Sequence, residues 1–186
     1  MRCFSLFYTH QSWSFGASKE LKKSIKASKE REKRIIEQEH QLIQANPTYK
    51  KAYENITSIT GVGQIGGIAL LHLFLKYPEA NQRQITSLSG LNPIYRQSGS
   101  SLQSSYRISK SGSVLYRGAL FMGVMTAVRY DKNFKAFYNR LKANGKHTTQ
   151  AQIAVMRKII IVAHSLYKND AKYVKTVDTL EVETME

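Results

Sequence analysis

Residues 88–117 constrain the fold most strongly, because this stretch supplies little that a hydrophobic core requires. It is rich in Ser and Gly, carries four basic side chains, and lies between two apolar segments with helical patterning. A stretch of this composition belongs at the surface, where it presents hydroxyls and cations to the solvent. The sequence therefore predicts a helical scaffold with an inserted loop or small β-hairpin, with short strands at Tyr95–Gln97 and Tyr106–Ile108.

The segments on both sides of this stretch have apolar residues at the three-to-four spacing of helices. They predict a strongly apolar helix after Gly63, a short one at 82–89, and further helices at 112–130, 132–143 and 150–167. In the helix at 112–130, Leu120, Phe121 and Val124 are expected on the buried face. The last helix is predicted to be the most buried, with Thr148 and Thr149 as its caps. The predicted fold class is mainly α.

Composition divides the 186 residues into four parts. Residues 1–16 are predicted to be an unstructured or foreign N-terminus, 17–47 a long charged helix, 48–168 a helical domain, and 169–186 a flexible tail. Between Ser18 and Ala45 there is no Gly or Pro, and a thin apolar seam runs through Leu21, Ile25 and Ile35. Such a seam favours a weak coiled coil and hence a homo-oligomer, although a solvated surface helix is equally consistent with it.

The charge is strongly one-sided. The chain carries 28 Lys and Arg against 13 Asp and Glu, a net charge of +15. Between Asn55 and Asn169 the only acids are Glu79 and Asp131, and 15 bases give that region +13. This excess favours a polyanionic partner, foremost nucleic acid, over a charge excess that serves solubility alone or a face for acidic lipid.

Several classes of site find no support in the residues. A single cysteine, Cys3, excludes an internal disulfide and a Cys-rich zinc site, and the five His residues show no ligand spacing. No apolar run approaches the roughly 18 residues of a membrane span. We therefore expect a cytoplasmic protein with no membrane partner, no metal site and no cofactor of its own.

The turn Gly61-Val62-Gly63 joins two helical patterns and has the form of a helix-hairpin-helix signature. Two glycines permit a sharp turn that brings unpaired amides at a helix N-terminus toward a phosphate of the DNA backbone. Contact of Gly61 and Gly63 with DNA is one interpretation. The other is a tight turn between two core helices, in which Gly66 and Gly67 allow close packing.

The order of motifs resembles a known family. The segments TGVG, SGLNP, QSG and RISKSGS with a following Arg are succeeded by DKNFKAFYNRLKANGK and AQIAVMRKI, over about Ile56 to Tyr167. This combination is similar to the C-terminal transposase domain of the insertion-sequence 110/116/902 group, which are RNA-guided serine recombinases. The resemblance implies DNA transposition, DNA as a partner and guide RNA as a possible second one.

The resemblance also implies a nucleophile. In that family a serine attacks the DNA phosphodiester, and the matching residue is Ser98 in Gln97-Ser98-Gly99, although Ser100 and Ser101 lie in the same loop. A serine hydroxyl needs activation, and nearby cations offset the charge that grows on the phosphate. The candidate cations, all expected to contact DNA, are Arg96, Arg107, Lys110 and Arg117.

One departure from the family pattern stands out. The family's N-terminal domain carries an Asp-Glu-Asp-Asp tetrad for a divalent metal such as magnesium, whereas no aspartate precedes Asp131 here. We therefore expect a truncated transposase that lacks the N-terminal catalytic domain, so its enzymatic activity stays open. The alternatives are a non-catalytic nucleic-acid-binding module of helix-hairpin-helix type and a coiled-coil interaction protein.

Overall fold

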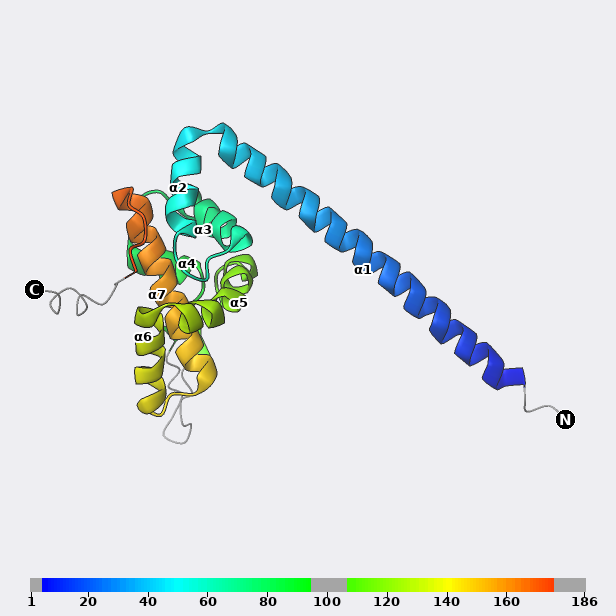
Figure 1. Ribbon diagram of the computed structural model, residues 1–186. Helices are drawn as coiled ribbons and strands as arrows, with labels where there is room; N and C mark the ends of the chain where they lie inside the picture. Colours follow the sequence, from blue (N-terminus) through cyan, green and yellow to red (C-terminus); the bar gives the residue numbers. More distant parts are fainter. Residues whose placement is uncertain (1–4, 95–106, 176–186) are drawn as a thin grey trace, which may run out of the picture. The chain divides into compact units, whose positions relative to one another are not determined.

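The computed structural model describes residues 5–94 and 107–175, with side chains from residue 18 onward. Residues 1–42 form one unit and residues 43–186 another. The prediction of a mainly α-helical fold is confirmed, since seven helices and one two-stranded sheet make up the described parts (Figure 1). None of those helices combines the length and the apolar content needed to cross a membrane.

The described part of the first unit is helix α1 (Ser5–Ala45) up to Leu42. The last turn of this helix, from Ile43, is assigned to the second unit. Its apolar seam is exposed, with Leu21 62% and Ile35 49% accessible. The helix begins well before residue 17, so the prediction of an unstructured segment up to residue 16 is wrong for residues 5–16. That segment contains no proline and its one glycine is Gly16, so an established helix extends through it at little cost per residue.

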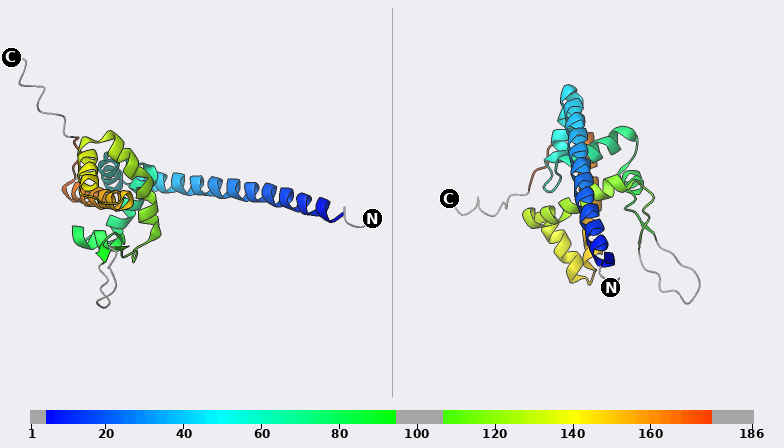
Figure 2. Two further views of the ribbon diagram at one scale, coloured as in Figure 1. Left: turned by 90° about the horizontal axis from the view of Figure 1, so that it is seen from below. Right: turned by 90° about the vertical axis from the view of Figure 1, so that its right-hand side faces the viewer.

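The second unit is built from six helices around one core (Figure 1, Figure 2). Helices α2 (Pro47–Thr57) and α3 (Gln64–Lys76) are joined by the glycine turn, and α4 (Gln82–Leu88) follows. Helices α5 (Val114–Tyr130) and α6 (Lys132–Ala143) come after the Ser-rich stretch, and α7 (Thr148–Asn169) ends the unit. Helix α7 packs against all five other helices. The prediction that it is the most buried is wrong, because α3 buries seven of its 13 residues and α7 seven of its 22.

Side chains at the helix ends explain where several of these helices begin. Asn46, Asn81 and Asp131 each accept backbone N–H groups of the first turn, and Pro47 occupies the first turn of α2, where no N–H is needed. For α7 the predicted caps are wrong. His147 is the cap instead: its Nδ1 accepts from the Thr149 N–H at 3.3 Å, and the Gln150 side chain accepts from the His147 N–H at 3.2 Å.

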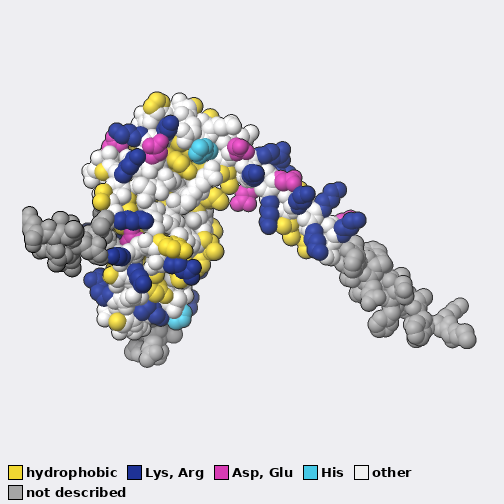
Figure 3. Space-filling view, viewed as in Figure 1, with side chains coloured by type: hydrophobic (Ala, Val, Ile, Leu, Met, Phe, Trp, Pro, Cys, Tyr) yellow, Lys and Arg dark blue, Asp and Glu magenta, His cyan; other side chains and the backbone are white. Residues whose placement is uncertain are grey.

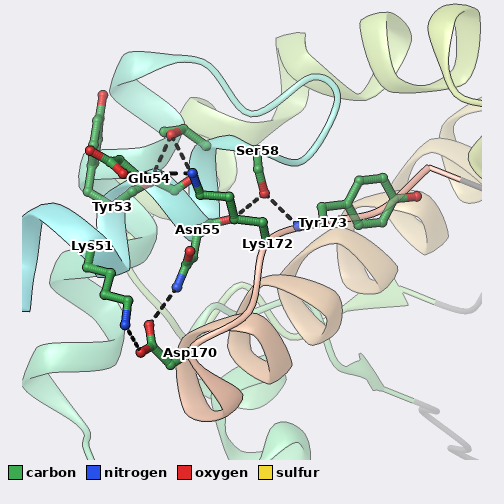
Figure 4. Close-up of polar contacts among 9 residues, drawn as sticks. Lys51, Tyr53, Glu54, Asn55, Ser58, Asp170, Lys172 and Tyr173 are labelled. Atoms are coloured by element: carbon green, nitrogen blue, oxygen red, sulfur yellow. Dashed lines mark hydrogen bonds and ion pairs between the residues drawn. The ribbon is translucent and has the colours of Figure 1, made fainter.

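The C-terminal strap, residues 170–175, folds back onto the unit (Figure 4). The carboxylate of Asp170 pairs with Lys51 and accepts a hydrogen bond from Asn55 Nδ2 at 2.9 Å. The Tyr173 N–H donates to Ser58 Oγ at 2.8 Å. The prediction of a loose tail is therefore wrong for residues 169–175. Asn169 still belongs to α7, and the strap is held by its ion pair and hydrogen bonds with α2 and with Ser58, which follows α2.

Candidate nucleic-acid interface

The described residues on either side of residues 95–106 form a compact structure that we call the loop base, residues 89–94 and 107–113. Strand β1 (Pro93–Ile94) pairs with β2 (Arg107–Ile108) in antiparallel register, with Pro93 opposite Ile108. The Ser109 N–H donates to the Asn92 carbonyl at 2.9 Å, and the Ser109 hydroxyl bonds the Asn92 side chain. The small hairpin expected from the sequence is thus present at its foot, and the predicted strand at 95–97 lies outside the described residues.

Two glycines let the two halves of the loop base come into direct backbone contact. A Cβ on Gly112 would lie 1.9 Å from the Leu88 carbonyl oxygen, and one on Gly90 would lie 2.8 Å from the Gly112 nitrogen. No side chain fits in either place. Lys110 sits between them with a φ of 55°, which is unfavourable for a side-chain-bearing residue, and its N–H donates to the Gly90 carbonyl at 3.1 Å. The surrounding contacts hold this strained conformation.

Arg117 ties the loop base to α5. Its Nη1 donates to the Gly112 carbonyl at 2.8 Å and to the Ser89 carbonyl at 3.2 Å, so one guanidinium nitrogen joins both halves. Arg117 is half-buried, whereas Arg107 and Lys110 are exposed. The structure therefore gives Arg117 a positioning contact that the sequence did not predict, and leaves Arg107 and Lys110 as the accessible cations at the foot of the loop. Ser98 and Arg96 lie outside the described residues.

The sequence left two roles open for the glycines in and near the turn, DNA contact and close helix packing, and the structure separates these glycines into two groups. Gly61 has a φ of 91°, and a Cβ there would lie 2.3 Å from the Gly123 carbonyl oxygen of α5, so this glycine serves close packing. Gly67 does the same against α2, because a Cβ on it would meet Thr57 Cγ2 at 2.5 Å. Gly63 is different: it is exposed, nothing lies within 4 Å of a Cβ placed on it, and no side chain caps the N-terminus of α3 there.

Among the described residues 55–169, negative charge at the surface comes mainly from Glu79. Asp131 is only 3% exposed, and its carboxylate accepts from the N–H groups of Asn133 and Phe134 and from the Tyr173 hydroxyl. Burial and this carboxylate raise the pKa of Tyr173 above its ordinary value. The positive face of the unit therefore has few carboxylates to neutralise it, and Figure 3 shows Lys and Arg side chains gathered over α6.

Comparison with known proteins bears directly on this structure. Residues 53–139, from α2 to α6, match the family described as Transposase IS116/IS110/IS902. This segment is therefore similar to the IS116/IS110/IS902 transposase family. The family resemblance predicted from the sequence is thereby confirmed, and the transposase segment contains the glycine turn, the loop base and Arg117.

Two kinds of relatives accompany the family match. The pilin gene-inverting proteins of Moraxella bovis and Moraxella lacunata are each 29% identical to this chain over 143 residues, which is 74% of the chain and 43% of each relative. An IS110 uncharacterized 43.6 kDa protein of Streptomyces coelicolor is 26% identical over 156 residues, 82% of the chain and 37% of that protein. The chain thus spans less than half of the length of these relatives.

The residues that the sequence missed are those that build the loop base. Asn92 and Ser109 join its halves, and Ser111 Oγ lies 3.0 Å from Ser109 Oγ within one half. The signal available in the sequence is the pairing of Asn-Pro at 92–93 with Ser-Lys-Ser-Gly at 109–112, both typical of turns. Neither element indicates by itself that the other is its partner.

Proposed function

We propose that this chain binds DNA through its basic helical unit and holds the loop of residues 95–106 against a phosphodiester, with Ser98 as the nucleophile. The observation that carries the proposal is the loop base. It joins the residues on either side of the Ser98 stretch, within the segment that matches the transposase family, and Arg107 and Lys110 are exposed there. The names of the relatives, which describe gene inversion and an insertion element, support a role in DNA recombination or transposition.

The chemistry is a transesterification. The Ser98 oxygen forms a bond to phosphorus, one phosphorus–sugar-oxygen bond breaks, and the proton lost by the serine ends, in net balance, on the departing sugar oxygen. Negative charge grows on the phosphate oxygens as five-coordinate phosphorus forms, and fixed cations stabilise that charge. Arg107 and Lys110 are exposed and follow directly on the loop, so they are the residues proposed for this task.

The carboxylates of this chain do not fit the magnesium site that the family resemblance implies. No aspartate precedes Asp131 in the sequence, and Asp131 itself is buried as a helix cap. In residues 18–94 and 107–175, no three His, Cys, Asp or Glu side chains gather closely enough to hold a metal ion. The step proposed here therefore uses only the serine and the cations of the chain.

Salt-dependent DNA binding tests the first half of the proposal. Fluorescence anisotropy with a labelled duplex should give a steep fall in affinity with rising salt, because each phosphate contact releases counterions. Replacing Arg107 and Lys110 by Ala should reduce the slope of log K against log salt by about 2. The matched control replaces the exposed cations Lys22 and Lys26 of α1, which are remote in sequence from the loop base. Equal losses in both double variants would contradict the proposal.

A covalent adduct tests the second half. A duplex with a bridging phosphorothiolate has a good sulfur leaving group, so a protein–DNA link should accumulate and survive denaturing electrophoresis. Ser98→Ala should abolish this adduct without changing duplex affinity. Ser100→Ala is the control and should retain it. An adduct that persists in Ser98→Ala would reject this residue as the nucleophile, and DNA binding with no adduct in any variant would reject nucleophilic catalysis.

The second candidate function is a nucleic-acid-binding module without chemistry. The observation that favours it is the open N-terminus of α3 at Gly63, where backbone N–H groups have no side-chain cap. Such a terminus attracts phosphate through its unpaired amides and the helix dipole. In this case Gly63 substitutions should alter affinity, and no covalent product should form with any DNA substrate.

The proposal extends to partners and location. The exposed apolar seam of α1, with Leu21, Ile25 and Leu42 between 47% and 71% accessible, is suited to pairing with a second copy of the chain. Sedimentation or light scattering should then show a dimer that Leu21→Lys with Ile25→Lys converts to a monomer; a monomeric native chain would contradict it. Guide RNA as a partner follows from the family resemblance, and a cytoplasmic location is the expectation drawn from the sequence; both belong to the same proposal.

A further inference from the structure

A groove between α6 and α7 lies apart from the loop base in sequence and has its own chemistry. It encloses about 470 Å³ and is closed on one side by the C-terminal strap. Phe137 and Val162 give it an apolar lining, and Phe134 lies at its inner end with only 1% exposure. The ring of Tyr173, from the strap, stacks on Phe134 with centroids 6.1 Å apart. This volume falls within the range of sites that hold small molecules or single residues of a polymer.

Two cations lie over the same aromatic ring in this groove. The Arg140 guanidinium carbon is 5.4 Å and the Lys158 ammonium nitrogen 4.9 Å from the centre of the Phe137 ring. The ring quadrupole attracts both and limits their movement. Two like charges on one ring repel each other, so an anion that contacts both would be bound favourably.

Among the residues that the structure describes, no carboxylate lines the groove to neutralise these cations. The nearest acid in sequence to the lining of α6 is Asp131, whose oxygens are already used by two backbone N–H groups and the Tyr173 hydroxyl. Asn133 adds a polar side chain at the same end of the groove as Tyr173. The site therefore combines a cation pair, an aromatic surface and hydrogen-bonding groups.

We propose that this groove binds one unpaired nucleotide of a single-stranded nucleic acid. The phosphate lies against Arg140 and Lys158, and the base lies against the apolar lining formed by Phe137 and Val162. Aromatic surfaces beside basic side chains are the usual means of holding single strands, because every base offers a flat face. The groove is thus proposed to bind single-stranded nucleic acid, whereas the loop base is proposed to hold a duplex. Binding in the groove does not depend on Ser98.

The chain itself contains an alternative occupant for the groove, its acidic segment. Residues 176–186 begin three residues after Tyr173 and contain four acids and no base: Asp178, Glu181, Glu183 and Glu186. An acidic peptide satisfies a cation pair but offers no flat ring to the aromatic surface. The nucleotide is therefore favoured, and the acidic segment becomes one outcome of the test.

The test measures binding of a fluorescein-labelled twelve-nucleotide oligothymidine by anisotropy. Arg140→Ala with Lys158→Ala should weaken binding more than tenfold. Phe137→Leu, which keeps an apolar side chain but removes the ring, should weaken it about 5- to 100-fold. The charge-matched control replaces the exposed Lys135 and Lys146 and should cost less than threefold. Thermal denaturation of each variant confirms that the fold is retained.

Three results have defined meanings. Equal affinities of the groove variant and the charge-matched control would overturn the inference. A second pair of results would also overturn it: the groove variant binds the oligonucleotide normally, and removing residues 176–186 lowers the melting temperature only when Arg140 and Lys158 are both present. In that case the acidic segment occupies the groove. If Arg107→Ala with Lys110→Ala leaves duplex binding unchanged while the groove variants still lose single-strand binding, the proposed function fails and this inference stands.

Discussion

Gly63 offers the sharpest separation between folding and DNA contact. It is the N-cap of α3, has extended backbone angles that any residue adopts (φ −84°, ψ −172°), and faces open space. Gly63→Asp therefore introduces no strain. Its carboxylate should accept the free N–H groups of the first turn and occupy the place where the second candidate function puts a DNA phosphate.

The two expected effects have opposite signs. An Asp cap and its favourable position at the positive end of the helix dipole should stabilise the unit by about 0.5–1.5 kcal/mol. For a unit of this size that corresponds to a rise in melting temperature of about 2–6 °C. A carboxylate about 5 Å from a phosphate at an effective dielectric constant between 20 and 80 costs about 1–3 kcal/mol. Duplex affinity should therefore fall about 5- to 100-fold.

Gly63→Ser is the matched control, because a serine caps the helix without adding a charge. Melting temperature by circular dichroism and duplex affinity by anisotropy are measured for both variants at the same salt concentration. The Asp variant should be the more stable and the weaker binder, and the Ser variant should bind DNA within about threefold of the native chain. An Asp variant that is stabilised but binds duplex normally would show that the N-terminus of α3 does not contact phosphate.

Three further predictions concern the fold that supports the interface. Gly61→Ala combines a positive φ with a contact of 2.3 Å to the Gly123 carbonyl, so urea denaturation should show a loss of about 2–4 kcal/mol; a loss below 0.5 would contradict the packing role. Arg117→Ala leaves the two loop-base carbonyls without their donor; we expect a loss of about 1–3 kcal/mol and less covalent adduct, whereas unchanged adduct would refute its positioning role. Burial and repulsion by Lys168 lower the pKa of His164 below 6.5, so the unfolded chain takes up the proton first and native stability falls as the pH drops below 6.5. His164→Gln should reduce this pH dependence in thermal scans, and an equally steep dependence would contradict it.

The helices were predictable where strong local signals agree. The helix predicted at 132–143 has the same bounds as α6, because Asp131 caps its start and Asn144-Gly145 ends it, with Gly145 at a φ of 71°. The mainly α fold follows from such segments. At the two ends of the chain local signals misled. The aromatic residues before Gly16 show no helical period although α1 begins at Ser5, and the strap is held by contacts with residues more than 100 positions away.

The buried face of α5 shows a different limit of sequence patterning. This helix is apolar around most of its circumference, so periodicity does not single out one side. Leu120 and Val124 are buried as predicted, but Phe121 is 45% exposed, and Tyr116 is buried instead with its hydroxyl 3.0 Å from His72 Nδ1. Tertiary neighbours on α3 decided which face points inward.

The sequence pointed to candidate residues for the site and not to its geometry. Local composition identified the serine-bearing loop and the exposed cations Arg107 and Lys110. It did not reveal that Gly90 and Gly112 bring the loop ends into backbone contact, because that pairing joins turns 22 residues apart. The groove of α6 and α7 was missed for the same reason, since Phe137 and Lys158 come from different helices.

The most direct test of the central claim is to identify the residue that carries DNA after reaction with the phosphorothiolate duplex. Trypsin should release the peptide 97–107, which contains Ser98, Ser100 and Ser101, and fragmentation in the mass spectrometer locates the attached nucleotide. The account predicts the nucleotide mass on Ser98. A nucleotide on another residue, or a peptide 97–107 that is never modified while DNA remains bound, would contradict it.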